Sequence, residues 1–186
     1  MTELWLVRHG QTDWNAVLRY QGQTDIPLNA TGLAQARALA DRLRGQRFSA
    51  LYTSDLQRAA QTARILGEAL GLDARPHRGL REICFGEWEG FTRDEVHARY
   101  ADLVAERRSH PLDSRPPGGE TNRELAQRIA ATADEIARAY PECRVLVVSH
   151  GLALAMLTCL ACGYPLEDVY AHGLDNAEPR VVSWIR

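Results

Sequence analysis

Two histidines of the chain follow apolar runs in the same way. Leu4 to Val7 leads into Arg8-His9-Gly10, and Val145 to Val148 leads into Ser149-His150-Gly151. Unbroken apolar runs of this length are typical of buried parallel strands, and open α/β sheets bind ligands at the carboxyl ends of such strands. A single histidine in this position is more often a core or capping residue. Two histidines with the same context, each before a glycine that lets a ligand approach the backbone, predict one shared site.

Two arginines are placed where an anion would stabilise them. Arg8 directly follows an apolar run, where an unpaired charge is costly, so a carboxylate or a bound phosphate must lie beside it. Arg58 falls in the first turn of an expected helix that Ser54 or Asp55 can cap, where the helix dipole disfavours a cation and favours a bound anion. A solvated surface arginine is the alternative for Arg58. Two guanidinium groups and two imidazoles together predict a pocket for a phosphoryl group.

The elements that must position these residues alternate along the chain. Strands are expected at residues 4–7, 50–53, 74–77, 145–148 and 181–185. Apolar residues recur with helical spacing over residues 31–44, 54–70 and 120–140, and a further buried helix follows His150. The third of these helices opens with a Thr121-x-x-Glu124 capping box. Alternating strands and helices predict a layered α/β fold with a mostly parallel sheet.

The size and charge of the chain exclude several classes of protein. Its 186 residues suit a single domain covering residues 1–186. Residues 83–119 show weak periodicity, so they are expected to form a short lid-like insertion over one end of the sheet. The formal net charge of −2 excludes a strongly basic nucleic-acid-binding protein. All 22 basic residues are arginine, so no lysine is present to serve as a Walker lysine or to form a Schiff base.

The sequence does not predict export or membrane insertion. The N-terminus shows no basic segment followed by an apolar one, and the longest apolar run, Leu152 to Cys162, is too short to cross a bilayer. We therefore expect a cytoplasmic protein whose four cysteines are reduced. Cys159-x-x-Cys162 lies in a helix-like apolar run without a second Cys-x-x-Cys pair, so packing is favoured over half of a zinc site or a redox pair.

The histidine and arginine positions belong to a longer series of motifs. The first is Leu-Val-Arg-His-Gly-Gln-Thr-Asp-Trp-Asn at residues 6–15. The others follow in order over nearly the whole chain, at residues 22–28, 54–59 with 61–63, 80–82 with 85–90, 117–120 and 148–151. This ordered set resembles the histidine phosphatase superfamily, the phosphoglycerate-mutase-like enzymes, and is far more specific than the Arg-His-Gly triplet alone. The resemblance implies a three-layer αβα sandwich with a mostly parallel central sheet.

The resemblance also assigns roles to individual residues. His9 would be the nucleophile that accepts the phosphoryl group as phosphohistidine, and Glu82 would protonate the leaving oxygen and then activate water. The catalytic residues implied in this way are His9, Glu82, His150, Arg8 and Arg58. The implied substrate-binding residues are Arg8, Asn15, Gln21, Gly22, Arg58, His150 and Gly151. Without the resemblance, the sequence does not distinguish Glu82 from Glu87 and Glu89, since a loop carboxylate is usually solvated.

This set of residues is chemically consistent with phosphoryl transfer. Only a neutral imidazole has a lone pair to attack phosphorus, and cationic neighbours lower the pKa of His9 and favour that form. Fixed arginines meet the charge on the transferring oxygens, and a carboxylic acid supplies the proton that an alkoxide leaving group needs. A covalent intermediate divides the reaction into two easier steps. The expected enzyme therefore needs no metal and no cofactor.

Hydrolysis is favoured over mutase activity. Phosphoglycerate mutases usually continue after the second histidine as His-Gly-Asn-Ser, whereas this chain reads His150-Gly151-Leu152-Ala153. They tend to have Gly-Trp in place of Gly22-Gln23, and the segment from Glu82 to Glu120 is short for shielding an intermediate from water. We predict a metal-independent phosphomonoesterase resembling α-ribazole phosphatases and small broad-specificity phosphatases. The alternatives are a cofactor-dependent phosphoglycerate mutase and a non-catalytic regulator that binds a phosphorylated partner.

The substrate is only weakly encoded in the sequence. α-Ribazole 5′-phosphate is one candidate, because Trp14 and Trp88 can stack on a ring, although packing of the loops explains these tryptophans equally well. Candidates to line the mouth of the site are Trp14, Arg19, Gln21, Thr24, Trp88, Phe91 and His110. We expect a small phosphorylated metabolite as the ligand, no nucleic-acid or membrane partner, and a monomer or a homodimer.

Overall fold

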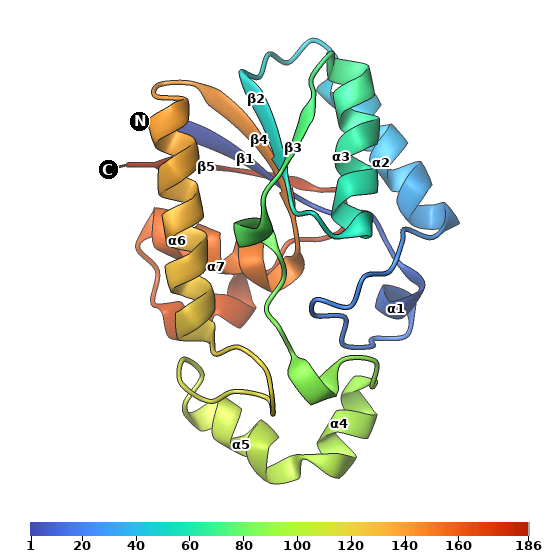
Figure 1. Cartoon of the computed structure of the whole chain (residues 1–186), viewed down its shortest axis with the longest axis vertical. Helices are drawn as coiled ribbons and strands as arrows, with labels where there is room; N and C mark the ends of the chain where they lie inside the picture. The colour runs from blue at the N-terminus through green and yellow to red at the C-terminus, as the bar shows by residue number, and fades with distance from the viewer. Residues whose placement is uncertain (186) are drawn as a thin grey trace.

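A central five-stranded sheet organises the molecule (Figure 1). The structure is a computed structural model that describes residues 1–185. The strands are β1 (Thr2–Arg8), β2 (Ala50–Thr53), β3 (Ala74–Pro76), β4 (Arg144–Ser149) and β5 (Pro179–Trp184). Their order is β3-β2-β4-β1-β5, and neighbouring strands are parallel except for β5, which runs antiparallel to β1. The predicted α/β fold with a mostly parallel sheet is therefore confirmed.

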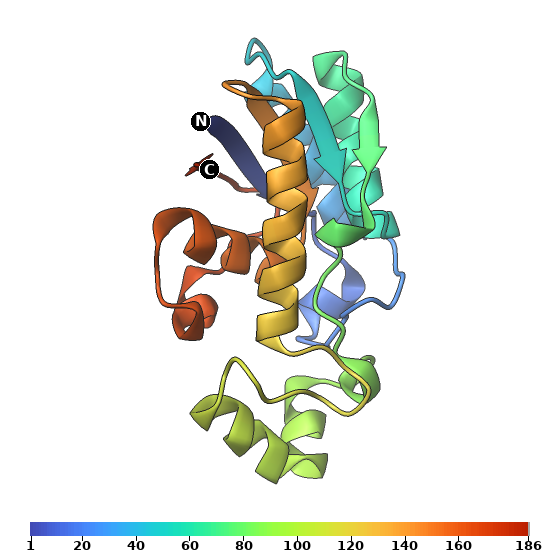
Figure 2. The same cartoon turned by 60° about the vertical axis from the view of Figure 1, so that its left-hand side comes forward.

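Helices cover both faces of this sheet and complete the three layers (Figures 1 and 2). The helices that pack on its two faces are α2 (Ala30–Leu43) with α3 (Gln57–Leu70), and α6 (Asn122–Ala139) with α7 (Gly151–Cys162). Successive side chains of a strand point to opposite faces. In β1, Leu6 packs towards α6 and α7, whereas its neighbour Val7 packs towards α2 and α3. Burial on both faces explains why β1 and β4 read as unbroken apolar runs.

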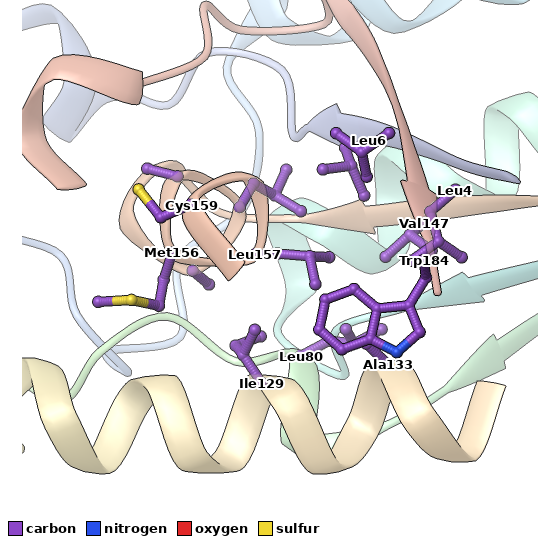
Figure 3. Packing of buried hydrophobic residues seen from close by; sticks show 14 of the residues in the cluster. Leu4, Leu6, Leu80, Ile129, Ala133, Val147, Met156, Leu157, Cys159 and Trp184 are labelled. Atoms are coloured by element: carbon purple, nitrogen blue, oxygen red, sulfur yellow. The ribbon is translucent and has the colours of Figure 1, made fainter. Parts of the chain in front are cut away.

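Trp184 of β5 closes the core between the sheet, α6 and α7 (Figure 3). Its indole lies against α6 near Ala133, and its Nε1 donates a hydrogen bond to Asp134 Oδ1 at 2.9 Å. Each large apolar side chain buried in this way contributes about 1.5–3 kcal/mol. Cys159 is buried in the same core, as predicted, whereas Cys162 is exposed, so packing does not explain Cys162. All four cysteines are free.

The sequence predicts the beginning of α6 correctly and that of α3 incorrectly. Thr121 Oγ1 accepts from the Glu124 N–H at 3.1 Å, and Glu124 Oε2 accepts from the Thr121 N–H at 2.8 Å, so the predicted capping box is present. Helix α3 begins later than predicted, at Gln57. The Gln57 N–H donates to Asp25 Oδ1 at 2.7 Å. The carboxylate at the start of α3 therefore comes from a distant loop and not from Asp55.

The segment expected as a lid-like insertion lies at one end of the molecule (Figure 2). Within residues 83–119 it contains η2 (Gly86–Trp88), α4 (Arg93–Arg99) and α5 (Ala101–Ser109). The sequence does not predict α4 or α5, because apolar residues do not recur along one side of either helix. Trp88 anchors the segment: it is 2% exposed, and its ring centroid lies 5.6 Å from that of Tyr20 and 6.1 Å from that of Tyr100.

Three further short elements are absent from the sequence prediction. They are α1 (Asp13–Ala16), η1 (Arg78–Leu80) and η3 (Leu166–His172). Helices of one or two turns carry too few residues for a periodic pattern to appear in the sequence. Among residues 1–185, no helix is long and apolar enough to span a membrane.

Candidate active site

Neighbouring strands bring the two histidines together. β1 and β4 pair in parallel with Arg8 opposite Ser149, so the next residue of each chain segment, His9 or His150, lies at the same edge of the sheet. The centroids of their imidazole rings are 5.1 Å apart, and the ring planes are inclined by 63°. Both side chains are buried. The strand register thus places the two imidazoles side by side at the carboxyl ends of β1 and β4.

Hydrogen bonds define which nitrogen of His9 is available for chemistry. Nδ1 lies 2.7 Å from the Gly10 carbonyl oxygen, which can only accept, so Nδ1 carries the hydrogen. Nε2 accepts a hydrogen bond from Arg58 Nε at 3.3 Å and therefore presents a lone pair. Burial, followed by the charges of Arg58 and Arg8, holds the pKa of His9 well below its ordinary value. His9 is neutral at pH 7, which is the form that attacks phosphorus.

Arg58 is a buried residue of the first turn of α3. Its two terminal nitrogens donate to backbone carbonyls, Nη1 to Thr24 at 2.8 Å and Nη2 to Gly22 at 2.7 Å. Burial lowers the pKa of Arg58 to about 10, so the guanidinium stays charged at neutral pH. The alternative of a solvated surface arginine is therefore wrong, because the side chain is 0% exposed.

Glu89 shapes the loop that holds Arg58. Its carboxylate accepts hydrogen bonds from the N–H groups of Gln23 at 3.0 Å, Thr24 at 2.9 Å and Phe85 at 3.0 Å. Gly22 adopts a φ of +51°, and a Cβ at this position would lie 2.0 Å from Glu89 Oε1. Glu89 therefore has a structural task, and the Gly22 carbonyl reaches Arg58 only because a glycine fits there.

The structure distinguishes the three glutamates that the sequence leaves open. Glu87 accepts a hydrogen bond from the exposed hydroxyl of Tyr100 at 3.1 Å, and Glu82 is the one that lines the same pocket as His9. The Glu82 carboxylate accepts hydrogen bonds from the backbone N–H groups of Leu152 and Ala153, each at 3.0 Å. It thereby caps α7, whose first turn has no cap from its own side chain.

Two buried nitrogens near His9 have no hydrogen-bond partner in the described part of the chain: Arg8 Nε and His150 Nδ1. Arg8 Nη1 donates to the Leu174 carbonyl oxygen at 2.9 Å, and among residues 1–185 no carboxylate lies within ion-pair distance of Arg8. Leaving a buried donor unsatisfied costs about 1–3 kcal/mol. Burial lowers the pKa of Arg8, and the charges of Glu82 and Asp175 oppose this shift, so carboxylates do act on Arg8 without bonding to it. The unpartnered Nε is left available to a bound anion.

Ser54 orients the second histidine. Ser54 Oγ accepts from the Leu56 N–H at 3.3 Å and lies 2.8 Å from His150 Nε2. Within the described residues, Nε2 is the acceptor available to the buried Ser54 hydroxyl hydrogen, so the bond is satisfied when the hydroxyl donates to Nε2 and the hydrogen of the neutral ring sits on Nδ1. Burial, followed by the charges of Arg58 and His9, lowers the pKa of His150 well below its ordinary value. The unpartnered Nδ1 is thus a donor. The sequence singled out Ser54 only as a helix cap.

These side chains meet at a pocket of about 960 Å³. Most of the residues predicted to act at the site line it: Arg8, His9, Asn15, Gln21, Gly22, Arg58, Glu82 and Gly151. His150 is not among the lining residues and lies behind them, next to His9. Asn15 Oδ1 accepts from the Thr12 N–H at 3.0 Å and is therefore already engaged in capping α1.

Only some of the residues expected at the mouth line this pocket. Trp14, Arg19, Gln21 and Trp88 do, whereas Thr24, Phe91 and His110 do not. The Thr24 hydroxyl donates to Glu89 Oε2 at 2.6 Å, and the Arg99 guanidinium lies 4.1 Å over the Phe91 ring. Trp88 is buried against other rings and is not free to stack on a ligand, which corrects the stacking expectation for that residue. Trp14 is partly exposed.

The outer wall of the pocket comes from elements that the sequence did not reveal. Arg93 and His97 of α4, Arg108 of α5, and Tyr170 of η3 line it. No motif marks these positions, and a single sequence carries no signal that would bring them together. Within the described residues, no group of three or more His, Cys, Asp or Glu side chains is arranged to hold a metal ion.

The fold and the site together define a phosphatase built around two histidines. The family model described as "Histidine phosphatase superfamily (branch 1)" matches residues 4–186, and the chain belongs to this superfamily. The uncharacterized phosphatase PhoE of Bacillus subtilis (strain 168) is 39% identical over 166 residues, covering 89% of this chain and 80% of that protein. The probable phosphoglycerate mutase GpmB of Enterobacter sp. (strain 638) is 39% identical over 169 residues, covering 89% and 77%.

Solved structures agree with this assignment. A mycobacterial glucosyl-3-phosphoglycerate phosphatase, solved in complex with VO3, has a TM-score of 0.88 and 34% identity, covering 97% of this chain and 92% of that one. The α-ribazole phosphatase of Shigella flexneri has a TM-score of 0.88 and 27% identity, covering 97% and 90%. The chain is thus similar to phosphatases whose named substrates differ.

Proposed function

We propose that this histidine phosphatase is a metal-independent phosphomonoesterase that transfers the phosphoryl group of a small ester first to His9 and then to water. His9 Nε2 attacks phosphorus while the ester oxygen leaves with a proton from Glu82. Glu82 then takes a proton from the water that attacks the phosphohistidine. Free imidazole and inorganic phosphate result, and Glu82 returns to its protonated form.

The state of His9 carries this proposal. A neutral imidazole has its Nδ1–H engaged by the Gly10 carbonyl and its Nε2 lone pair held beside Arg58. Among residues 1–185, Arg8 Nε and His150 Nδ1 are buried and have no hydrogen-bond partner. Arg8 lines the pocket, where a phosphoryl oxygen would satisfy its Nε, and the His150 ring lies next to His9. A nucleophile surrounded by unsatisfied donors suits a transition state whose oxygens carry negative charge.

The proposed substrate is a small phosphorylated metabolite. The pocket is much larger than a phosphate group, and its outer wall combines the Trp14 ring with the cationic side chains of Arg93 and Arg108. α-Ribazole 5′-phosphate remains a candidate, supported by the likeness to the Shigella flexneri α-ribazole phosphatase and by the partly exposed Trp14. A panel of phosphate esters ranked by kcat/KM, including this one and sugar phosphates, identifies the preferred leaving group.

Turnover of p-nitrophenyl phosphate in the presence of EDTA tests the proposal. The wild-type protein is expected to release phosphate under these conditions, and His9→Ala is expected to lose this activity. A quenched reaction with labelled substrate should leave an acid-labile phosphoryl group on His9. Loss of activity on chelation would refute the metal-free mechanism, and phosphate binding without turnover would instead support the regulator.

Mutase activity is the second candidate, because a probable phosphoglycerate mutase is among the relatives with 39% identity. The protein is mixed with 3-phosphoglycerate and a trace of 2,3-bisphosphoglycerate. Rapid interconversion without release of phosphate would replace the phosphatase proposal. Release of phosphate without interconversion is the expected result, since Leu152 and Ala153 carry apolar side chains where mutases usually carry polar ones.

A further inference from the structure

Glu82 lies in irregular backbone, although its proposed role demands accurate placement. The residue falls between η1 and η2, so its own backbone belongs to no helix or strand, although N–H groups at the start of α7 bind its carboxylate. A catalytic group must be held within about 0.5 Å of its productive position, and elements of regular structure usually provide this. Something else must therefore hold the backbone of residues 79–84.

Arg128 of α6 binds the backbone that leads into Glu82. Its Nη1 donates to the carbonyl oxygens of Gly79 and Arg81, each at 2.9 Å. Its Nη2 donates to the carbonyl oxygen of Glu82 itself at 3.3 Å. One guanidinium group thus connects three carbonyls of residues 79–82, from η1 into the irregular backbone at Glu82, to a regular helix.

Glu120 binds the backbone that leaves Glu82. Its Oε2 accepts a hydrogen bond from the Cys84 N–H at 3.3 Å, and its own N–H donates to the Cys84 carbonyl at 2.8 Å. The same carboxylate forms a two-point ion pair with Arg128, Nε to Oε1 at 3.0 Å and Nη2 to Oε2 at 2.8 Å. The pair is only partly exposed, so it is less screened by solvent than an ion pair on the surface.

We propose that the Arg128–Glu120 ion pair is a positioning device for Glu82, gripping its backbone on both sides and so holding its carboxyl group beside His9. This rests on the proposed function, in which Glu82 protonates the leaving oxygen. Neither Arg128 nor Glu120 lines the pocket, so the pair acts through Glu82 and not on the substrate. It also gives a role to the Pro117-Gly118-Gly119-Glu120 motif.

Arginine suits this position better than lysine. The five bonds of Arg128 use all three nitrogens of a planar group, and a lysine ammonium cannot reproduce that geometry. Arg123, on the same helix, forms a comparable two-point ion pair with Asp113, at 2.6 and 2.9 Å, but both of these side chains are exposed. Arg123→Gln is therefore a matched control: it breaks an ion pair of the same kind on the same helix, at a residue that does not bind the backbone around Glu82.

The test compares two esters that differ chiefly in their leaving group, phenyl phosphate and p-nitrophenyl phosphate. Nitrophenolate leaves without a proton, whereas phenoxide benefits from one. kcat/KM reports the steps up to the first transfer and excludes hydrolysis of the phosphohistidine. Arg128→Gln is expected to lower kcat/KM for phenyl phosphate by about 10- to 100-fold more than for p-nitrophenyl phosphate. Arg123→Gln should leave both values unchanged.

A cycle with Glu82→Gln separates positioning from general stabilisation. If Arg128 acts through Glu82, the double variant Glu82→Gln, Arg128→Gln discriminates between the two esters no more than Glu82→Gln alone. Burial is the main cause of the lowered pKa of His150, and Arg128 contributes to it, but a change there would affect both esters alike. Glu120→Gln keeps an acceptor for the Cys84 N–H and provides a milder variant in case Arg128→Gln does not fold.

The outcomes distinguish this inference from the proposed function. Equal losses on the two esters in both Arg128→Gln and Glu120→Gln, or losses that add to those of Glu82→Gln, would overturn the positioning role while leaving the phosphatase intact. Failure of the wild-type protein to hydrolyse either ester, or full activity in His9→Ala, would overturn the proposed function itself.

Discussion

Arg58 Nε lies 3.3 Å from His9 Nε2 and donates a hydrogen bond to the nitrogen proposed to attack phosphorus. The other two nitrogens of the guanidinium are held by the carbonyls of Gly22 and Thr24. When a phosphoryl group approaches Nε2, the same Nε–H is in place to meet one of its oxygens. The nucleophile and its charged neighbour are thus aligned before substrate arrives, which is the preorganisation that electrostatic catalysis requires.

Replacing Arg58 by lysine tests the geometry of the guanidinium group separately from its charge. Arg58→Lys keeps the cation but cannot donate to Gly22, Thr24 and His9 at once. We expect kcat/KM for p-nitrophenyl phosphate to fall by about 10²- to 10³-fold, as for the loss of an oxyanion-hole donor. Arg64→Lys, in an exposed ion pair on the same helix, is the control and should retain wild-type activity. Wild-type kcat/KM in Arg58→Lys would show that charge alone suffices.

The two buried imidazoles predict a stability that falls with acidification. The pKa values of His9 and His150 are lowered in the folded protein, so below their ordinary pKa the unfolded chain binds protons that the native state does not. Stability therefore rises with pH between the folded pKa and about 6.5. Urea unfolding at pH 7.5 and 5.5 should show a loss of about 1.4 kcal/mol for each of these histidines. In His9→Asn, the loss of unfolding free energy between pH 7.5 and 5.5 should be smaller than in wild type by the contribution of one histidine. An identical loss would mean that His9 is charged in the folded state at pH 5.5.

Gly22→Ala should reduce both stability and activity. The left-handed backbone costs about 1–3 kcal/mol for a residue other than glycine, and the added Cβ would meet Glu89 Oε1 at 2.0 Å. Displacing the Gly22 carbonyl also frees Arg58, so kcat/KM is expected to fall by about 10- to 100-fold.

Gly71→Ala introduces the same left-handed backbone strain as Gly22→Ala but without a steric clash, so it separates the two effects. Gly71 has a φ of +68°, and nothing lies within 4 Å of an added Cβ there. This variant should lose stability in thermal unfolding while keeping wild-type kcat/KM. Equal kinetics in the two variants would argue against a link between Gly22 and the site.

Ser54→Ala tests how the second histidine is oriented. Without the hydroxyl that lies 2.8 Å from Nε2, the ring of His150 is no longer biased towards the form with hydrogen on Nδ1. We expect a fall of roughly 5-fold in kcat/KM, corresponding to about 1 kcal/mol for one neutral hydrogen bond. ¹⁵N NMR of the imidazole should report a mixture of tautomers. The control is Ser109→Ala, which removes a hydroxyl that donates to the Ala105 carbonyl oxygen in α5. An unchanged tautomer in Ser54→Ala would show that the Ser54 hydroxyl does not set the tautomer of His150.

The sheet and the two strand-end histidines were predictable because their signals are local. β1 and β4 are buried on both faces, so their residues are apolar without interruption, and the strand-His-Gly order places each imidazole at a carboxyl end. The capping box of α6 lies within four residues of sequence and was predicted for the same reason. Local physics therefore recovers the fold and the position of His9 and His150.

The rest of the site depends on contacts between distant segments. Glu82 differs from Glu89 only in what surrounds it: the N-terminus of α7 in one case and the loop at residues 22–24 in the other. The cap of α3 by Asp25 and the grip of Arg128 on residues 79–82 likewise join segments that are far apart in sequence. No periodicity encodes such pairings, so only the folded chain reveals them.

The position of β4 between β2 and β1 has a consequence for synthesis of the protein. His9 leaves the ribosome early, whereas the strand that aligns it with His150 is made only after some 140 further residues. Parallel pairing over so long a separation is slow, because the entropy of closing the loop is lost before any contact compensates for it. A nascent chain would therefore carry its nucleophile in an inert form, and recovery of turnover during refolding should follow strand insertion and not helix formation.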